Sequence, residues 1–77
     1  MKLTYDPRYN IAYIRFREKR KDVEAIRVSE EVVVDIAPDG SIYGVELLNA
    51  NEQLKFSDEG KVLLVNEATG MQQEFVL

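Results

Sequence analysis

Apolar and polar side chains alternate with a period of two along most of this chain, a pattern typical of β-strands with one buried face. Leu3 and Tyr5 alternate with polar neighbours, and turn-forming residues at 6–10 separate this run from the next. In the second run, residues 11–17, the apolar side chains share one face: Ala12, Ile14 and Phe16. The opposite face carries Ile11, Tyr13, Arg15 and Arg17. Together the two runs predict a hairpin.

The strongest local signal is at residues 32–48, where two apolar runs flank Asp39-Gly40, a dipeptide typical of hairpin turns. A loop of two or four residues sets apolar side chains opposite one another: Val34 opposite Val45, and Ile36 opposite Tyr43. A three-residue loop would instead bury a carboxylate among these side chains, at a cost of several kcal/mol. We therefore predict the first register, which places Asp35, Gly44 and Glu46 on the opposite, polar face.

The rest of the chain shows shorter signals. We expect a third strand at 23–28, one helical turn at 49–55, a turn at 57–60, and a final hairpin with strands at 61–66 and 71–76. The predicted fold class is all-β, or β-rich α+β with one short helical turn, built as an antiparallel meander of hairpins in a small sheet or barrel. Residues 1–77 are expected to form a single domain, with the C-terminal hairpin at 61–76.

Composition excludes much chemistry. The chain has 77 residues and no Cys, His or Trp, so thiolate or imidazole metal sites cannot form, and only a cation held by oxygens is conceivable. The Ser and Thr hydroxyls have no His base, and the glycines form no phosphate-binding motif, so we expect neither an enzyme nor a cofactor. A domain this small, without disulfides, favours self-association, and we expect a homodimer. Without an apolar leader or a run of ~18 apolar residues, we expect a cytoplasmic protein that does not enter membranes.

Two blocks of residues carry a resemblance to a known family. They are Tyr5-Asp6-Pro7 followed by Ala12-Tyr13-Ile14-Arg15, and Val33-Val34-Asp35 followed by Asp39-Gly40 and Gly44-Val45-Glu46-Leu47-Leu48. Over about residues 3–50 the chain resembles the small bacterial Domain of Unknown Function 2283 family, with Asn10 where the family often carries Asp. The resemblance implies a bacterial origin and a β-rich fold. Some relatives are thought to lie beside small toxin-like proteins, which implies an antitoxin-like role, and the resemblance implies no activity.

Asp35 and Glu46 are the candidate ligand residues, because the predicted register places them diagonally on one face with Gly44 opposite Asp35. The space above Gly44 could admit a ligand, another backbone or an aromatic ring such as Tyr13. One interpretation is a site for a small ligand or a divalent cation bound by oxygens. The other is that Gly44 serves packing and that the acids form ion pairs with arginines on the sheet.

Charge is uneven along the chain. Residues 1–27 contain eight Lys or Arg and four Asp or Glu, a balance of +4, whereas residues 28–77 contain two and ten, a balance of −8. The candidate interaction surface gathers the basic hairpin end and one aromatic ring: Tyr13, Arg15, Arg17, Lys19, Arg20 and Lys21.

Three interpretations of this surface are open. It could bind a partner protein or the acidic part of a second copy, it could be a solvated hairpin end, or it could bind nucleic acid with Tyr9, Tyr13 and Phe16 as stacking partners. A pI near 4.7 argues against nucleic acid. We therefore expect a small bacterial protein-interaction module that self-associates and is antitoxin-like.

Overall fold

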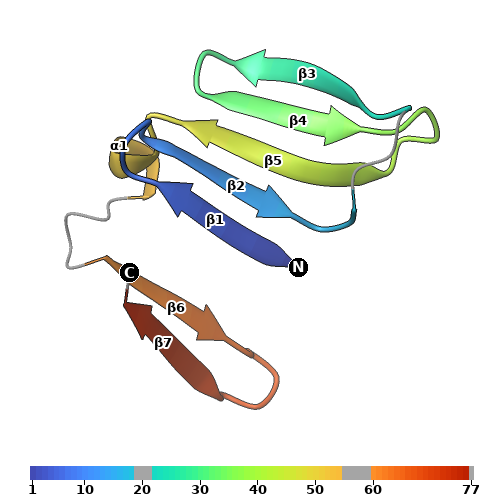
Figure 1. Cartoon of the computed structure of the whole chain (residues 1–77). Helices are drawn as coiled ribbons and strands as arrows, with labels where there is room; N and C mark the ends of the chain where they lie inside the picture. Colours follow the sequence, from blue (N-terminus) through green and yellow to red (C-terminus); the bar gives the residue numbers. More distant parts are fainter. Residues whose placement is uncertain (19–21, 55–59, 77) are drawn as a thin grey trace.

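The computed structural model describes residues 1–18, 22–54 and 60–76, and Figure 1 shows the course of the chain. Five strands form the main sheet: β1 (Lys2–Asp6), β2 (Ile11–Arg15), β3 (Glu24–Ser29), β4 (Val32–Ile36) and β5 (Ile42–Leu48). A short helix, α1 (Ala50–Leu54), follows, and then a separate hairpin of β6 (Lys61–Val65) and β7 (Gln72–Val76). The predicted β-rich fold with one helical turn is confirmed.

The main sheet is antiparallel and has the order β1-β2-β5-β4-β3. Strands β3, β4 and β5 form the expected meander, but β2 pairs with β5 instead of with β3, so strands β2 to β5 follow a Greek-key order (Figure 1). In the described part of the chain, strands β1 and β3 each pair with one neighbour only, so the sheet is open and is not a barrel. This order also places β4 and β5, from the acidic part of the sequence, between the more basic β2 and β3.

The pairings divide the main sheet into two faces. Side chains of one face, here called the apolar face, are almost all apolar: Leu3, Tyr5, Ala12, Ile14, Ile26, Val32, Val34, Ile36, Val45 and Leu47. The other, the charged face, contains most of the ionisable side chains of the sheet, including Lys2, Arg15, Arg27, Asp35 and Glu46. The alternation predicted for β1 and β2 is therefore confirmed.

The hairpin between β4 and β5 corrects one predicted detail. Asp35 pairs with Gly44 and Val34 with Val45, as predicted, but Ile36 pairs with Ile42 and not with Tyr43. The loop has three residues, the length that we rejected from the sequence. Two observations identify it: the amide of Ala37 donates to the carbonyl of Ser41 at 2.9 Å, and Gly40 has a φ of 89°.

A β-bulge explains how the predicted pairing of Asp35 with Gly44 is kept beside a three-residue loop. Tyr43 is the extra residue of β5, and skipping it restores the predicted pairing from Gly44 onward. The carboxylate that the rejected loop would have buried thus stays on the charged face. The bulge also turns Tyr43 inward, where it is only 6% exposed, and directs its carbonyl to the amides of Phe16 and Arg17.

Helix α1 begins where Asn10 and Asn49 meet at one end of the sheet. Both residues have a left-handed backbone, with φ values of 57° and 52°, which Asn tolerates better than most residues. The Oδ1 of Asn10 accepts a hydrogen bond from the amide of Asn51 at 2.7 Å, and its carbonyl accepts one from the amide of Ala50 at 3.0 Å. The turn before β2 therefore supplies hydrogen-bond acceptors to the start of the helix.

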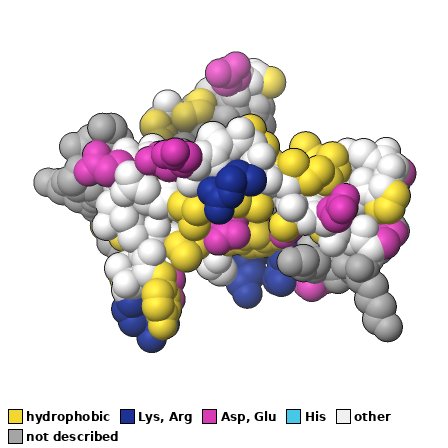
Figure 2. Space-filling view, turned by 90° about the horizontal axis from the view of Figure 1, so that it is seen from above, with side chains coloured by type: hydrophobic (Ala, Val, Ile, Leu, Met, Phe, Trp, Pro, Cys, Tyr) yellow, Lys and Arg dark blue, Asp and Glu magenta, His cyan; other side chains and the backbone are white. Residues whose placement is uncertain are grey.

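The core of the described chain is small. The buried apolar residues are Ala12, Ala37, Tyr43 and Ala50, and among the described residues no large side chain is less than 2% exposed. Within residues 1–18, 22–54 and 60–76, no second layer covers the apolar face of the sheet beyond its end at α1 (Figure 1). Many large apolar side chains consequently remain in contact with solvent, and Figure 2 shows hydrophobic groups exposed between charged ones.

Candidate functional site

The centre of the charged face is a hydrogen-bonded pair that spans three strands. Tyr13 on β2 donates from its hydroxyl to Oδ2 of Asp35 on β4 at 2.6 Å, although β5 lies between these strands. The ring passes over Gly44, where an added Cβ would lie 2.5 Å from the Cζ of Tyr13 and closer still to its hydroxyl. Of the occupants predicted for the space above Gly44, the structure shows the Tyr13 ring.

Burial and charge both perturb Tyr13. Its environment raises the pKa of the phenol to about 12, through burial first, then through the hydrogen bond to Asp35 and the negative charges of Asp35 and Glu46. The positive charge of Arg15 lowers the pKa, by less than Asp35 raises it but by more than Glu46 does. Tyr13 is therefore a neutral hydrogen-bond donor at any physiological pH, and it satisfies a carboxylate that is only 6% exposed.

The predicted ligand pair has a defined geometry. Asp35 pairs with Gly44 and Glu46 pairs with Val33, so the two acids lie diagonally on the charged face as expected. Within the described residues no group of three or more His, Cys, Asp or Glu could hold a metal ion. Tyr13 already donates to Oδ2 of Asp35, and the Asp35–Glu46 site stays a prediction.

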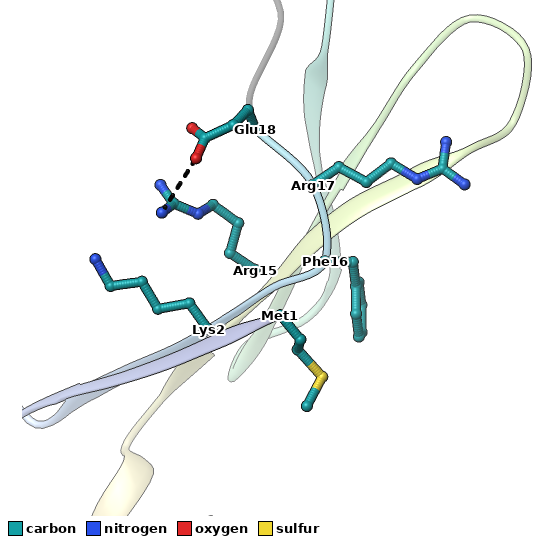
Figure 3. Close-up of a pocket in the computed structure, with 6 residues that line it drawn as sticks. All are labelled: Met1, Lys2, Arg15, Phe16, Arg17 and Glu18. Carbon is teal, nitrogen blue, oxygen red and sulfur yellow. Dashed lines mark ion pairs between the residues drawn. The ribbon is translucent and has the colours of Figure 1, made fainter.

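The basic hairpin end forms a shallow hollow at the corner where β1 begins and β2 ends (Figure 3). Its volume is about 330 Å³, and its lining mixes cations with apolar groups: Met1, Lys2, Arg15, Phe16, Arg17 and Glu18. Arg15 forms an ion pair of 3.5 Å with Glu18, and the guanidinium of Arg17 lies 5.5 Å from the ring centre of Tyr43. Lys19, Arg20 and Lys21, which complete the predicted surface, lie outside the described residues.

The three aromatic residues predicted to stack on nucleic acid do not lie together: Tyr9, Tyr13 and Phe16. Tyr9 lies in the turn before β2, at the opposite end of that strand from Phe16, and Tyr13 is held over β5. Beside Tyr9, the Arg8 guanidinium forms a 3.0 Å ion pair with Asp6 and holds the pKa of that carboxyl below its usual value. The structure therefore presents separate aromatic groups and no continuous stacking surface among them.

A second hollow lies between β1 and the β6–β7 hairpin. Its volume is about 450 Å³, and its lining is entirely apolar: Met1, Leu3, Val62, Leu64 and Phe75. We call it the apolar cavity. Sequence reasoning placed this hairpin correctly but missed the cavity. The sequence did contain a signal for an exposed apolar surface, since residues 62–65 are four consecutive apolar residues. Both faces of β6 are therefore apolar, and when one face packs the other is exposed.

The fold and these sites define a small protein with an open β-sheet and an exposed apolar face. The chain belongs to the family described as protein of unknown function (DUF2283), whose model matches residues 2–51. The match covers the five-stranded sheet and ends at the start of α1, so the β6–β7 hairpin lies beyond it. No curated protein and no solved structure matches the chain.

In the part of the chain that the structure describes, no helix could cross a membrane, since α1 has five residues.

Proposed function

We propose that this protein is a self-associating protein-interaction module whose dimer forms through the apolar face of the sheet. The observation that carries the proposal is the exposure of this face. Leu3 is 42% exposed and Ile26 is 46% exposed, although both lie on the face that the period-two pattern would bury. A sheet that is apolar on one face is stable in water only when another layer covers that face.

The size of the core supports a second copy as the missing layer. A compact chain of 77 residues has a radius of gyration of about 11.5 Å, whereas the Cα atoms of this chain give 14.1 Å. Without disulfides or metal-binding thiolates, oligomerisation is one of the remaining ways in which a chain of this size gains stability. A second copy offers the same apolar face, so a two-fold axis would bury both faces at once.

The area of the apolar face is comparable with the area that a dimer interface needs. With a strand spacing of about 4.8 Å and a rise of about 3.3 Å per residue, five strands of about five residues cover roughly 400 Å² as a flat rectangle. Protruding side chains increase the accessible area, and a stable interface buries about 800 Å² on each partner. The sheet face therefore supplies a large part of a dimer interface, and further surface must contribute the rest.

Sedimentation analysis over a range of protein concentrations tests the dimer. Ile26→Lys places a charge on the apolar face of β3, and we expect it to raise the dissociation constant at least about tenfold. Ala25→Lys is the matched control, because Ala25 is the adjacent, exposed residue on the charged face of the same strand. The proposal is wrong if the unaltered chain remains monomeric up to millimolar concentration, or if the two variants weaken the dimer equally.

An antitoxin-like role is the second part of the proposal, and the edge strand β3 supports it. All six residues of β3 are exposed, and among the described strands β3 pairs only with β4, so its free edge could accept a strand from another protein. The partner class that the family resemblance implies is a small toxin-like protein. A pull-down from the native host with intact-mass analysis should recover one stoichiometric protein partner, and recovery of the homodimer alone would contradict this role.

A further inference from the structure

The apolar cavity lies on the same side of the sheet as the apolar face. Met1 and Leu3 point to that side, because Lys2 between them pairs with Arg15 on the charged face. On the hairpin, Val62 and Phe75 are direct cross-strand partners, and Leu64 is two residues farther along β6, so all three share one face of the hairpin. The hairpin thus turns an apolar face toward the β1 end of the sheet, with about 450 Å³ between them.

The hairpin does not close this space with its own side chains. Leu64 is 56% exposed and Phe75 is 50% exposed, although both line the cavity. Leu3 on the opposite wall is 42% exposed. Among the described residues, two apolar surfaces therefore face each other across a gap that is open to solvent, and apolar groups that fill this gap would stabilise the arrangement.

Symmetry limits which part of a second copy can fill it. When two sheets pack with their strands aligned, a two-fold axis between the apolar faces runs close to the strand direction or close to perpendicular to it. An axis across the strands would place β1 over β1 and would force both hairpins into the same space. An axis along the strands places β1 of one copy over β3 of the other, because β1 and β3 are the two edges of the sheet. Each hairpin then lies beside the partner's β3.

We propose that the β6–β7 hairpin is a clasp for a second copy of this chain: apolar side chains of the partner's β3 enter the apolar cavity, with the partner's Ile26 against Leu64. The inference rests on the proposed dimer and specifies its geometry. Ile26 is 46% exposed and the neighbouring Val28 is 65% exposed, so the β3 edge carries apolar groups that need cover. The clasp also adds the interface area that the sheet face alone lacks.

Adjacent leucines of β6 provide a matched pair of positions for a test. Leu64 lines the cavity and is 56% exposed, whereas Leu63 points to the other face of the hairpin and is 57% exposed. The chain has no cysteine, so single cysteines report only designed contacts. Full-length Ile26→Cys, labelled with nitrogen-15, is mixed with unlabelled Leu64→Cys or Leu63→Cys and oxidised mildly, and intact mass identifies the mixed disulfide dimer.

We expect several-fold more mixed dimer with Leu64→Cys than with Leu63→Cys. Leu64→Lys should also raise the dissociation constant of the dimer more than Leu63→Lys, with both variants shown to be folded by circular dichroism. A dimer that forms equal amounts of both mixed disulfides overturns the clasp and leaves the sheet-face dimer intact. A chain that is monomeric at every concentration overturns the dimer itself, and the clasp with it.

Discussion

Tyr13 and Asp35 are joined by a 2.6 Å hydrogen bond although they lie on strands that are not neighbours. The bond crosses β5 at Gly44, the one position on that strand where the absence of a side chain leaves room for the ring. A single glycine therefore lets an aromatic side chain cover the sheet and provide a partner for a buried carboxylate. Three strands are thus tied together on the charged face by one side-chain contact.

Gly44→Ala should destabilise the protein through this contact. The new Cβ would lie 2.5 Å from the Cζ of Tyr13 and 3.0 Å from the carbonyl oxygen of Ile14. The ring must move, so we expect a loss of roughly 1–3 kcal/mol from overpacking, together with a weaker bond to Asp35. Urea denaturation followed by circular dichroism measures the change in the free energy of unfolding.

A double-mutant cycle separates the ring from other causes. In a Tyr13→Ala background the ring is absent, so Gly44→Ala should cost at least about 1 kcal/mol less than it does in the unaltered chain. An equal cost in both backgrounds would show that the backbone at Gly44, and not the ring of Tyr13, opposes a side chain there.

The raised pKa of Tyr13 predicts a specific loss of stability in alkali. The folded pKa of about 12 lies above the unfolded value of about 10. The folded state thus holds this proton more tightly, so its contribution is complete below pH 10 and is lost as the pH rises toward 12. The free energy of unfolding of the unaltered chain should therefore fall more steeply between pH 10 and 12 than that of Tyr13→Phe.

Absorbance provides an independent measurement of the same group. The difference between the phenolate titration curves of the unaltered chain and Tyr13→Phe isolates the ionisation of Tyr13. We expect a midpoint close to pH 12 in the folded protein, moving to about 10 in denaturant. A difference curve with its midpoint near pH 10 under native conditions would contradict the buried bond to Asp35.

Much of the sheet could be predicted from local pattern. Alternation assigned the faces of β1, β2 and the β4–β5 hairpin, because a shift of one residue would exchange buried and exposed side chains. The same argument placed Asp35 opposite Gly44. The bulge at Tyr43 could not be predicted, because a three-residue loop with one bulged residue gives the same pairing from Gly44 onward as the loop that we predicted.

The order of the strands in the sheet could not be predicted from the sequence. Alternation says which face a side chain occupies but not which strand lies next to it, so the pairing of β2 with β5 was not predicted. The contact between Tyr13 and Asp35 depends on that pairing. The Tyr13 ring was only one of the three occupants that we predicted for the space above Gly44. The uneven charge along the sequence likewise did not imply separate charged surfaces.

Asn10 should be important for stability because it has two roles at the start of α1. Its φ of 57° disfavours residues other than Gly and Asn, and its Oδ1 accepts a 2.7 Å hydrogen bond from the amide of Asn51. Asn10→Ala loses both, and we expect a cost of about 2 kcal/mol. Asn10→Gly loses only the side-chain bonds, so its cost should be smaller, about 1 kcal/mol.

Chemical denaturation of both Asn10 variants distinguishes the two roles. The difference between the Ala and Gly variants reports the backbone strain, and the difference between Gly and the unaltered chain reports the hydrogen bonds. If Asn10→Gly is as costly as Asn10→Ala, the left-handed backbone contributes nothing measurable. The affected region should be the junction of α1 with the sheet, so hydrogen exchange should increase at the amide of Asn51, which loses its bond in both variants.

The response of the dimer to salt distinguishes an apolar interface from a charged one. If basic and acidic surfaces held the copies together, raising NaCl from about 0.05 M to about 1 M would shorten the Debye length to about 3 Å and weaken the dimer strongly. Contact through the apolar face predicts instead a dissociation constant that changes by less than about threefold, because burial of apolar area is not screened by salt. Lys2→Glu, which reverses a charge at the basic corner, should also leave the constant unchanged. Sedimentation at both salt concentrations measures this directly, and a dimer that dissociates in high salt would assign the interface to the charged surfaces.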